Sequence, residues 1–263
     1  MKRTIVIAGL LLCSFAARAQ QGTITYTKTV KFEIQLPPEM QAQAANFPKE
    51  QKSEFELLFS NNKTLFRPVV QGSGDMTIDN GDGMVIKMVT PGANDLGYCD
   101  LAANKRLDKR ELGVKEDVVE DTLEKAKWKL TGETKVILGH TCKKATTQKT
   151  QKSIIMDDAG GKMEQKIITD TIAVSAWYAE DMTCQAGPEY AGNLPGTILE
   201  LQVGEMNYTA TKMDTKCDVK AIAPPKGKKI TKEQFRKEQD AFFKQMEEQH
   251  QQGPGPGHGP KGN

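Results

Sequence analysis

The stretch that decides the fold opens at residue 23 and reads TITYTKTVKFEIQLPP through residue 38. Apolar side chains fall on the even positions and polar ones on the odd positions. Because side chains alternate between the two faces of a strand, this pattern predicts a β-strand with one apolar and one solvent-facing side. Only Lys28 interrupts the apolar side. Pro37-Pro38 ends the strand, since proline donates no hydrogen bond to a neighbouring strand.

Further short strands follow in pairs, separated by turn residues. Asn80-Gly81-Asp82-Gly83, Gly132-Glu133 and Ala159-Gly160-Gly161 are predicted as hairpin turns. This spacing predicts an antiparallel sheet, sandwich or barrel, and consecutive hairpins favour a meander. The predicted pairs are 55–59 with 64–70, 76–78 with 84–89, 97–101 with 105–112, 128–130 with 135–138, 154–156 with 166–178, and 198–203 with 207–212.

The N-terminal residues have the three parts of a secretory signal peptide. Lys2 and Arg3 give a positive start, residues 5–15 form an apolar run, and Ala17-Arg18-Ala19 has the small-x-small spacing that signal peptidase cleaves. We predict that residues 1–19 are removed and that the mature chain starts at Gln20.

Two alternatives to cleavage fit the sequence less well. A membrane anchor needs roughly 20 apolar residues, far more than this run. A lipoprotein would need a small residue before Cys13, and Leu12 stands there. No second long apolar segment follows, so we expect an exported protein, periplasmic or secreted, that is soluble and not integral to the membrane.

Cleavage leaves a nearly neutral chain. The sequence has 36 Lys+Arg against 34 Asp+Glu, and losing three cations with the signal peptide leaves 33 against 34. A nucleic-acid-binding surface needs a basic excess, so we expect no nucleic-acid partner.

The C-terminal region changes character at Pro224-Pro225. Thr231 and Gln234 form a capping box that predicts a helix over 231–249. Its narrow apolar face comprises Phe235, Phe242, Phe243 and Met246. We therefore divide the chain into a signal peptide (1–19), an antiparallel β domain (20–223), a basic linker with an amphipathic helix (224–250), and a disordered Gly/Pro tail (251–263).

One segment carries a resemblance to a known family. Residues 187–201 read GPEYAGNLPGTILEL, which resembles the signature of the GLPGLI family, a group of uncharacterised proteins exported by Gram-negative bacteria. Asn193 replaces the first glycine of that signature and Thr197 its second leucine. The resemblance implies export and a curved sheet or open half-barrel, similar to those that carry or sense lipid in the periplasm, but no chemistry. Supporting segments are Trp128, GETKVILGHTCKKA at 132–145, Ala176-Trp177-Tyr178, and GKKITKEQF at 227–235.

The motif itself predicts a rigid turn. Pro195 suits the second position of a type II turn, and Gly196 supplies the positive φ of its third position. Asn193 can stand for glycine because asparagine tolerates the left-handed region. Such a turn is either purely architectural or the lip of a binding cleft. The predicted turn and strand start comprise Asn193, Leu194, Pro195, Gly196, Thr197 and Ile198.

Four cysteines remain after cleavage: Cys99, Cys142, Cys184 and Cys217. An even number in an exported protein permits disulfides, and four cysteines allow three pairings. Cys142 and Cys184 border the segments that carry the resemblance, so we predict that they pair. Cys99 and Cys217 then form a second bond or stay free.

His140 and Cys142 are the one close His/Cys pair, and a strand would point them to the same face. They are weak candidates for a metal site, because further ligands such as Cys184 or Met182 would have to join them in space. Cys142 in a disulfide and His140 in a turn are the plain alternatives. We expect no metal and no cofactor.

No catalytic constellation is visible in the sequence. A serine or cysteine nucleophile needs a histidine base, and only His140 lies outside the region of the tail. Carboxylate pairs such as Glu116-Asp117 are predicted to lie in solvated, turn-like stretches. We therefore expect a non-enzymatic protein that binds an apolar ligand or peptide in its curved sheet. The alternative is a cell-envelope interaction protein that acts through its C-terminal helix.

Overall fold

A computed structural model describes residues 21–31, 49–70, 75–79, 85–89, 94–158 and 163–251. The predicted signal peptide, the predicted start at Gln20, the turn at 80–83 and residues 252–263 of the predicted tail lie outside this part of the chain. In the described part, strands dominate and one α-helix follows them. The strands are β1 (Gly22–Lys31), β2 (Glu50–Ser60), β3 (Lys63–Pro68), β4 (Asp75–Asp79), β5 (Val85–Val89), β6 (Leu96–Asp100), β7 (Lys105–Leu112), β8 (Lys115–Thr122), β9 (Lys129–Ile137), β10 (His140–Asp158), β11 (Met163–Ala179), β12 (Thr197–Val203), β13 (Met206–Asp214) and β14 (Lys229–Thr231), and the helices are η2 (Val219–Ala221) and α1 (Lys232–Gln251).

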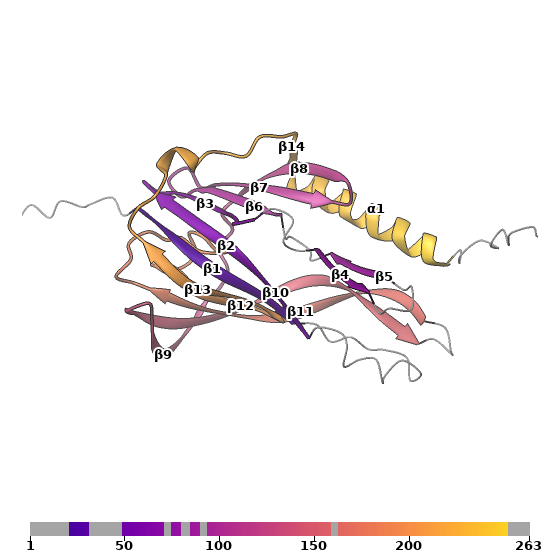
Figure 1. The fold of residues 1–263 in the computed structure, drawn as a ribbon, viewed down its shortest axis with the longest axis horizontal. Coiled ribbons are helices and arrows are strands. Elements are labelled where there is room, and N and C mark those ends of the chain that lie inside the picture. Colours follow the sequence, from indigo (N-terminus) through magenta and orange to yellow (C-terminus); the bar gives the residue numbers. More distant parts are fainter. Residues whose placement is uncertain are drawn as a thin grey trace, which may run out of the picture.

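Twelve of these strands form one open, curved sheet (Figure 1) in the order β14-β8-β7-β6-β3-β2-β1-β13-β12-β11-β10-β9. All neighbours are antiparallel except β14, which runs parallel to β8. Strands β4 and β5 form a separate hairpin. The predicted fold class, a mainly β protein with an antiparallel curved sheet and a C-terminal helix, is confirmed.

The chain builds this sheet as two meanders that meet at β1. The first runs outward from β1 to β8, and the second returns from β9 to β13, which pairs with β1. Figure 1 shows the arm that contains β6, β7 and β8 above the arm that contains β10, β11 and β12. We call the open side of the sheet, where the outer strands of the two arms face each other, the seam. Residues 123–128 cross this seam from β8 to β9.

Strand β1 confirms the predicted alternation as far as Lys31, and the predicted continuation to Pro37-Pro38 lies outside the described residues. Ile24 and Tyr26 are fully buried, and residues on the other parity are partly exposed. The Tyr26 hydroxyl donates to the carbonyl of Ile198 at 2.6 Å, which ties the centre of the sheet to β12. Lys28 shares the face of these core residues and is only 3% exposed.

Two core clusters lie on opposite faces of the first arm. Leu57 and Phe59 of β2 belong to the large cluster, while Leu58 between them belongs to the smaller one. The smaller cluster also holds Leu107 and is covered by Ile222, which follows η2. Burial on both faces explains why β2 is more continuously apolar than β1.

Two predictions about individual strands were wrong. Gly132-Glu133 is not a hairpin turn: β9 runs through it, and residues 131–133 together face Lys144 as a bulge. Gly132 adopts φ +82 there, and the chain reverses instead at Leu138-Gly139. Glu116-Asp117 lies in strand β8, where Asp117 is 4% exposed and pairs with Lys115 at 2.8 Å.

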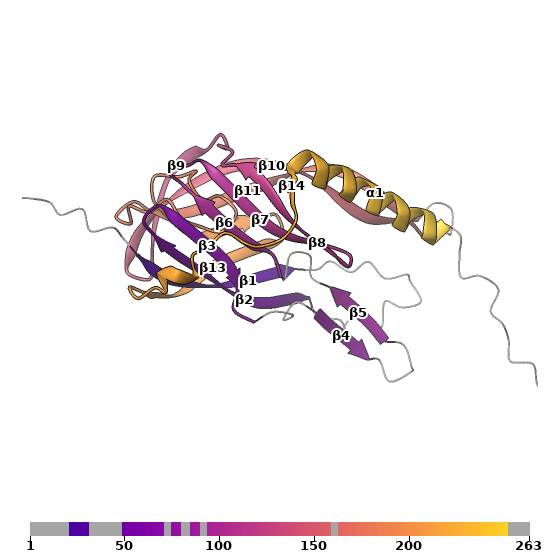
Figure 2. The ribbon, with the colours of Figure 1, turned by 90° about the horizontal axis from the view of Figure 1, so that it is seen from above.

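Helix α1 begins with the predicted capping box. The Gln234 side chain accepts from the Thr231 N–H at 2.9 Å, and the Thr231 hydroxyl accepts from the Gln234 N–H at 3.2 Å. The helix contacts β8 and β14 of one arm and β11 of the other, so it bridges the seam (Figure 2). Within the described residues, no helix is both long and apolar enough to cross a bilayer.

Candidate functional site

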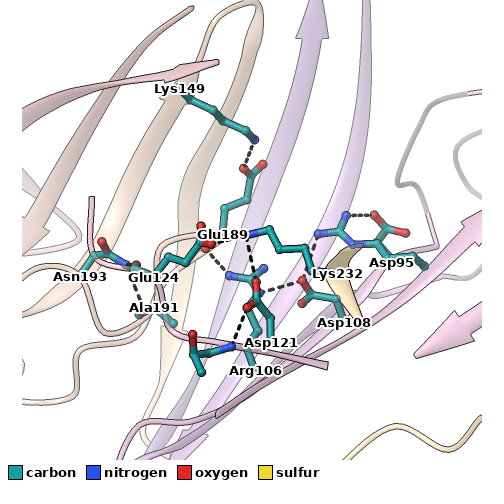
Figure 3. Close-up of polar contacts among 12 residues, drawn as sticks. Asp95, Arg106, Asp108, Asp121, Glu124, Lys149, Glu189, Ala191, Asn193 and Lys232 are labelled. Atoms are coloured by element: carbon teal, nitrogen blue, oxygen red, sulfur yellow. Dashed lines mark hydrogen bonds and ion pairs between the residues drawn. The ribbon is translucent and has the colours of Figure 1, made fainter. Parts of the chain in front are cut away.

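Charged side chains gather where the motif loop, residues 187–196, meets the interior of the curved sheet (Figure 3). They come from both arms and from the central strand. We call this group the Glu189 cluster. It comprises Lys28 of β1, Asp95 directly before β6, three residues of β7 (Arg106, Asp108 and Arg110), Lys149 of β10, Glu189 of the motif loop, and Tyr208 of β13.

Strand β7 supplies the cationic side of the cluster. Arg106, Asp108 and Arg110 alternate with Leu107, which is buried on the other face of the strand. Arg106 Nε donates to Asp108 Oδ2 at 2.8 Å, and Arg110 Nη2 reaches the same oxygen at 3.3 Å. Arg110 also pairs with Asp95. These charge-assisted bonds fix the two guanidinium groups in place.

Glu189 is the loop residue that enters the cluster. Its Oε1 accepts from the Tyr208 hydroxyl and its Oε2 pairs with Lys149 Nζ, both at 3.2 Å. Its backbone carbonyl accepts from Arg106. Glu189 has φ +52, a conformation that costs about 1–3 kcal/mol for a residue other than glycine. The three contacts offset this strain and hold the loop against the sheet.

Lys28 lies beside this network under two aromatic rings. Its Nζ is 5.5 Å from the centroid of Phe55 and 5.8 Å from that of Tyr208. A cation over an aromatic face is attracted by the ring, more strongly when it is removed from water. Burial nevertheless lowers the pKa of Lys28, against the opposing influence of Glu189 and Asp95.

The electrostatics keep the central carboxylate ionised. Burial opposes the charge on Glu189, but Lys149 and Arg110 outweigh burial and hold its pKa below the ordinary value. Burial and the charge on Glu189 raise the pKa of Tyr208, so its hydroxyl stays a donor. Four cations therefore surround three carboxylates and a neutral hydroxyl. This arrangement binds and orients charges, and its central carboxylate is poorly suited to exchange protons near neutral pH.

The motif loop is also tied to the crossover segment at the seam (Figure 3). Asn193 Oδ1 accepts from the Ala126 N–H at 2.8 Å and from Trp128 Nε1 at 3.4 Å. Its Nδ2 donates to the carbonyl of Glu124 at 3.0 Å. Lys232, at the start of α1, pairs with Asp121 at 3.0 Å and also with Glu124. One continuous network therefore joins the loop, the crossover and the helix.

The predicted type II turn was wrong. Neither Asn193 nor Gly196 has a positive φ; Gly192 does, at +76. Gly196 is required by space instead, because a Cβ built there would lie 2.1 Å from the carbonyl oxygen of Ala179. Leu194 is buried and Pro195 exposed. Thr197 donates to the carbonyl of Cys184 at 2.6 Å, so its hydroxyl fastens the start of β12.

The two weak metal candidates reach different surroundings. His140 Nδ1 lies 2.7 Å from Asp181 Oδ2 and its side chain is 28% exposed, whereas Cys142 is fully buried in the large core cluster. The described residues contain no group of three His, Cys, Asp or Glu side chains placed to hold a metal ion.

All four cysteines are free in the structure, so the predicted Cys142–Cys184 bond is not formed, and Cys99 and Cys217 follow the alternative in which both stay free. Cys142 and Cys184 do share the large core cluster. The pKa of both thiols is raised to about 11, mainly by burial. Cys99 and Cys217 lie in two different clusters, so the fold does not assign them to a common site.

The predicted helix face is partly covered by the chain's own sheet. Phe235, Phe242 and Phe243 are half-buried, and the side chain of Met246 lies outside the described residues. Phe242 packs on Gly113 in the β7–β8 turn, where an added Cβ would lie 3.1 Å from its ring. Lys115 pairs with Glu238 beside this contact.

Comparison with known proteins gives a family match for part of the chain. Residues 128–200 match a family model. Its description is "Protein of unknown function (Porph_ging)", and the matched segment contains β9 to β11 and the motif loop. A bacterial family of unknown function is consistent with the resemblance read from the sequence. No curated protein matches the chain.

Two solved structures of PNGF-II resemble the chain. The structure in space group C2 gives a TM-score of 0.50 at 16% identity, and the one in P21 gives 0.49 at 17%. The matches cover 86% of this chain but 33% and 34% of those chains, so this chain spans about a third of the proteins it matches. At such identity the likeness shows the fold alone.

Sequence reasoning missed the Glu189 cluster as a site. One signal was present: Lys28 is the single charged residue on the apolar side of β1. The alternation Arg-Leu-Asp-Lys-Arg at 106–110 was a second signal, because it places three charges on one face of a strand. What the sequence could not show is that Glu189 meets these residues across the fold.

Proposed function

We propose that the chain is an exported, non-enzymatic binding protein whose partner is an extended segment of another protein. The observation that carries this proposal is strand β9. It ends the sheet, with no strand on its outer side among the described residues. Leu130 and Val136 on it are 64% and 69% exposed, and Leu138 follows at 41%. Exposed apolar groups on an unpaired edge favour binding of another extended chain.

The interior of the sheet favours a peptide over an apolar small molecule. Tyr26, Leu199 and Leu201 are fully buried there, and the large core cluster fills the space around them. Two surface cavities of about 400 and 380 Å³ have charged groups in their linings, among them Lys52 with Glu54 and Lys109 with Glu111. An apolar ligand would desolvate those charges at a cost.

A non-enzymatic role agrees with the hydrogen bonds and ion pairs that the charged groups of the Glu189 cluster make within the chain. Both oxygens of Glu189 are held by neighbours, and its lowered pKa removes it from proton transfer near neutral pH. Export rests on the signal-peptide pattern of residues 1–19 and on the resemblance to the GLPGLI family.

The second candidate, an envelope partner bound by α1, has an observation of its own. Phe235 and Phe243 keep part of their surface exposed although Phe242 packs on Gly113. Truncation after Thr231, which keeps β14 and removes α1, tests it. Unchanged stability with loss of a partner supports an envelope partner bound by α1, whereas loss of stability supports a purely docked helix.

Site-specific crosslinking in the cell envelope tests the main proposal. A photoreactive amino acid is placed at Val136, at Val70 or at Val219, which are all at least 43% exposed. We expect a defined protein adduct from one of these positions and no small molecule retained in native mass spectrometry of the exported protein. A retained apolar ligand, with no adduct from any position, would overturn the proposal.

A further inference from the structure

We propose that the outer edge of β9 binds its partner by strand addition, and that the partner segment is acidic with apolar residues four positions apart. This inference rests on the proposed function and specifies the partner's chemistry. An extended chain that adds to an edge gains main-chain hydrogen bonds along the strand, and its alternate side chains meet the two faces of that strand.

One face of β9 carries two exposed apolar side chains, with Thr134 between them. Leu130 stands opposite Ala145 and Val136 opposite Thr141 on β10. Because Thr141 and Ala145 share a parity, both apolar side chains lie on the same face. They are separated by the length of four extended residues, about 13 Å. A straight partner strand therefore meets them with residues i and i+4.

The other face of β9 carries Lys129 and Lys135 beside Ile137. Lys129 and Lys135 stand opposite Thr146 and Cys142, which share the other parity of β10. Residues 125–144 contain six lysines and one glutamate. On this face Lys135 pairs with Glu200 and Lys144 with Glu133, whereas Lys143 pairs with Glu180 on the face of Leu130 and Val136. Lys127 and Lys129 are exposed and have no ion pair among the described residues. Carboxylates in the partner would complement them.

The bulge makes this edge selective. Residues 131–133 oppose Lys144 alone, and Thr131 Oγ1 braces the bulge by accepting from the Glu133 N–H at 3.3 Å. A bulge and lysines on an edge normally discourage strand pairing. Only a segment that neutralises the lysines and reaches both apolar side chains gains enough to bind. A second copy of this chain is disfavoured, because it would bring two lysine-rich edges together.

A designed peptide tests the proposal on the exported, full-length protein. The probe is a capped nine-residue peptide with valine at its third and seventh positions, glutamate after each valine, and threonine elsewhere. Binding is measured by fluorescence anisotropy, and its location by hydrogen exchange. We expect slower exchange of the amides in 129–137 and weaker binding at high salt. A version with lysine for glutamate should bind at least about tenfold more weakly.

The double variant L130T/V136T removes the two apolar side chains without adding charge, and V114T is its control. Val114 is fully exposed on the β7–β8 turn, far from β9 in the sheet order, so its substitution should leave binding unchanged. The double variant should bind the probe at least about tenfold more weakly at unchanged circular dichroism. Equal binding by the double variant, protection outside 129–137, or a peptide-independent dimer that occupies β9 would overturn the proposal. Crosslinks from Val70 or Val219 without any effect at β9 would overturn it while leaving the proposed function intact.

Discussion

The motif loop and strand β9 lie within the same family-matching segment, yet their side chains differ. Polar side chains of the loop have partners within the chain, whereas two apolar side chains of β9 stay exposed. In the loop, Glu189 uses both carboxylate oxygens and Asn193 both ends of its amide. In β9, Leu130 and Val136 keep about two thirds of their surface in water. The residues of the loop are therefore explained by folding. Those of β9 gain little from folding, which is why we propose that they contact a partner.

Gly196→Ala should have the largest effect, because the loop has no room for one more carbon. The added Cβ would lie 2.1 Å from the Ala179 carbonyl oxygen, and backbone cannot rotate away as a side chain can. We expect the free energy of unfolding to fall by about 3 kcal/mol in urea titrations.

Gly132→Ala is the matched control for that clash. Gly132 has φ +82 but no atom within 4 Å of an added Cβ, so only the backbone strain of about 1 kcal/mol applies. Equal losses at the two sites would contradict the assignment of Gly196 to close approach.

Glu189→Gln should have the next largest effect. The amide keeps the shape but removes the charge that faces Lys149 and Arg110, so we expect a loss of about 2 kcal/mol. Glu133 of β9 forms an exposed ion pair with Lys144 of β10, and Glu133→Gln should change stability by no measurable amount. A similar result for both would mean that the cluster contributes as little as a surface ion pair.

The same residue predicts a pH dependence. The folded pKa of Glu189 lies below its ordinary value of 4.5, so the stability it contributes is fully present above that pH. As the pH falls below 4.5 toward the folded pKa, the folded carboxylate must take up a proton and that stability is lost. Urea titrations between pH 6 and pH 3 should show a smaller decline for Glu189→Gln than for the wild type. Parallel declines would assign the acid sensitivity to other carboxyls.

Asn193→Gly should cost about 1 kcal/mol. The substitution removes the acceptor for Ala126 and Trp128 and the donor to Glu124. Asn104→Gly is the control, because Asn104 has φ +53 and glycine relieves that strain. Unchanged melting of Asn193→Gly would show that water replaces the amide without loss.

The sequence predicted what depends on local pattern. The alternation around Tyr26 identified the central strand and its buried face, and Thr231 with Gln234 identified the first turn of α1. The prediction of a positive φ at Gly196 was wrong. Both a positive φ and a close approach of backbone select glycine, and only the fold places Ala179 beside Gly196.

The sequence could not predict features that depend on distant partners. Glu189 meets Arg106 across 83 positions and Lys149 across 40, and no local spacing encodes such a meeting. The same limit applies to β9. Gly132 was predicted to lie in a turn, but β10 pairs with the residues of β9 before and after it. The exposure of Leu130 follows from its place at the end of the sheet, which the local sequence does not reveal.

A small effect on stability is expected for L130T/V136T, the double variant that should disrupt partner binding most. Because both side chains already face water, their replacement removes little buried surface, and we expect a change within about 0.5 kcal/mol. Leu201→Ala, at a fully buried position of β12, should by contrast cost about 3 kcal/mol. Urea titrations of the wild type, the double variant and Leu201→Ala measure the differences in the free energy of unfolding. If the double variant unfolded as easily as Leu201→Ala, then Leu130 and Val136 would support the fold itself. Their exposure would in that case no longer point to a partner, and the contrast between β9 and the motif loop would disappear.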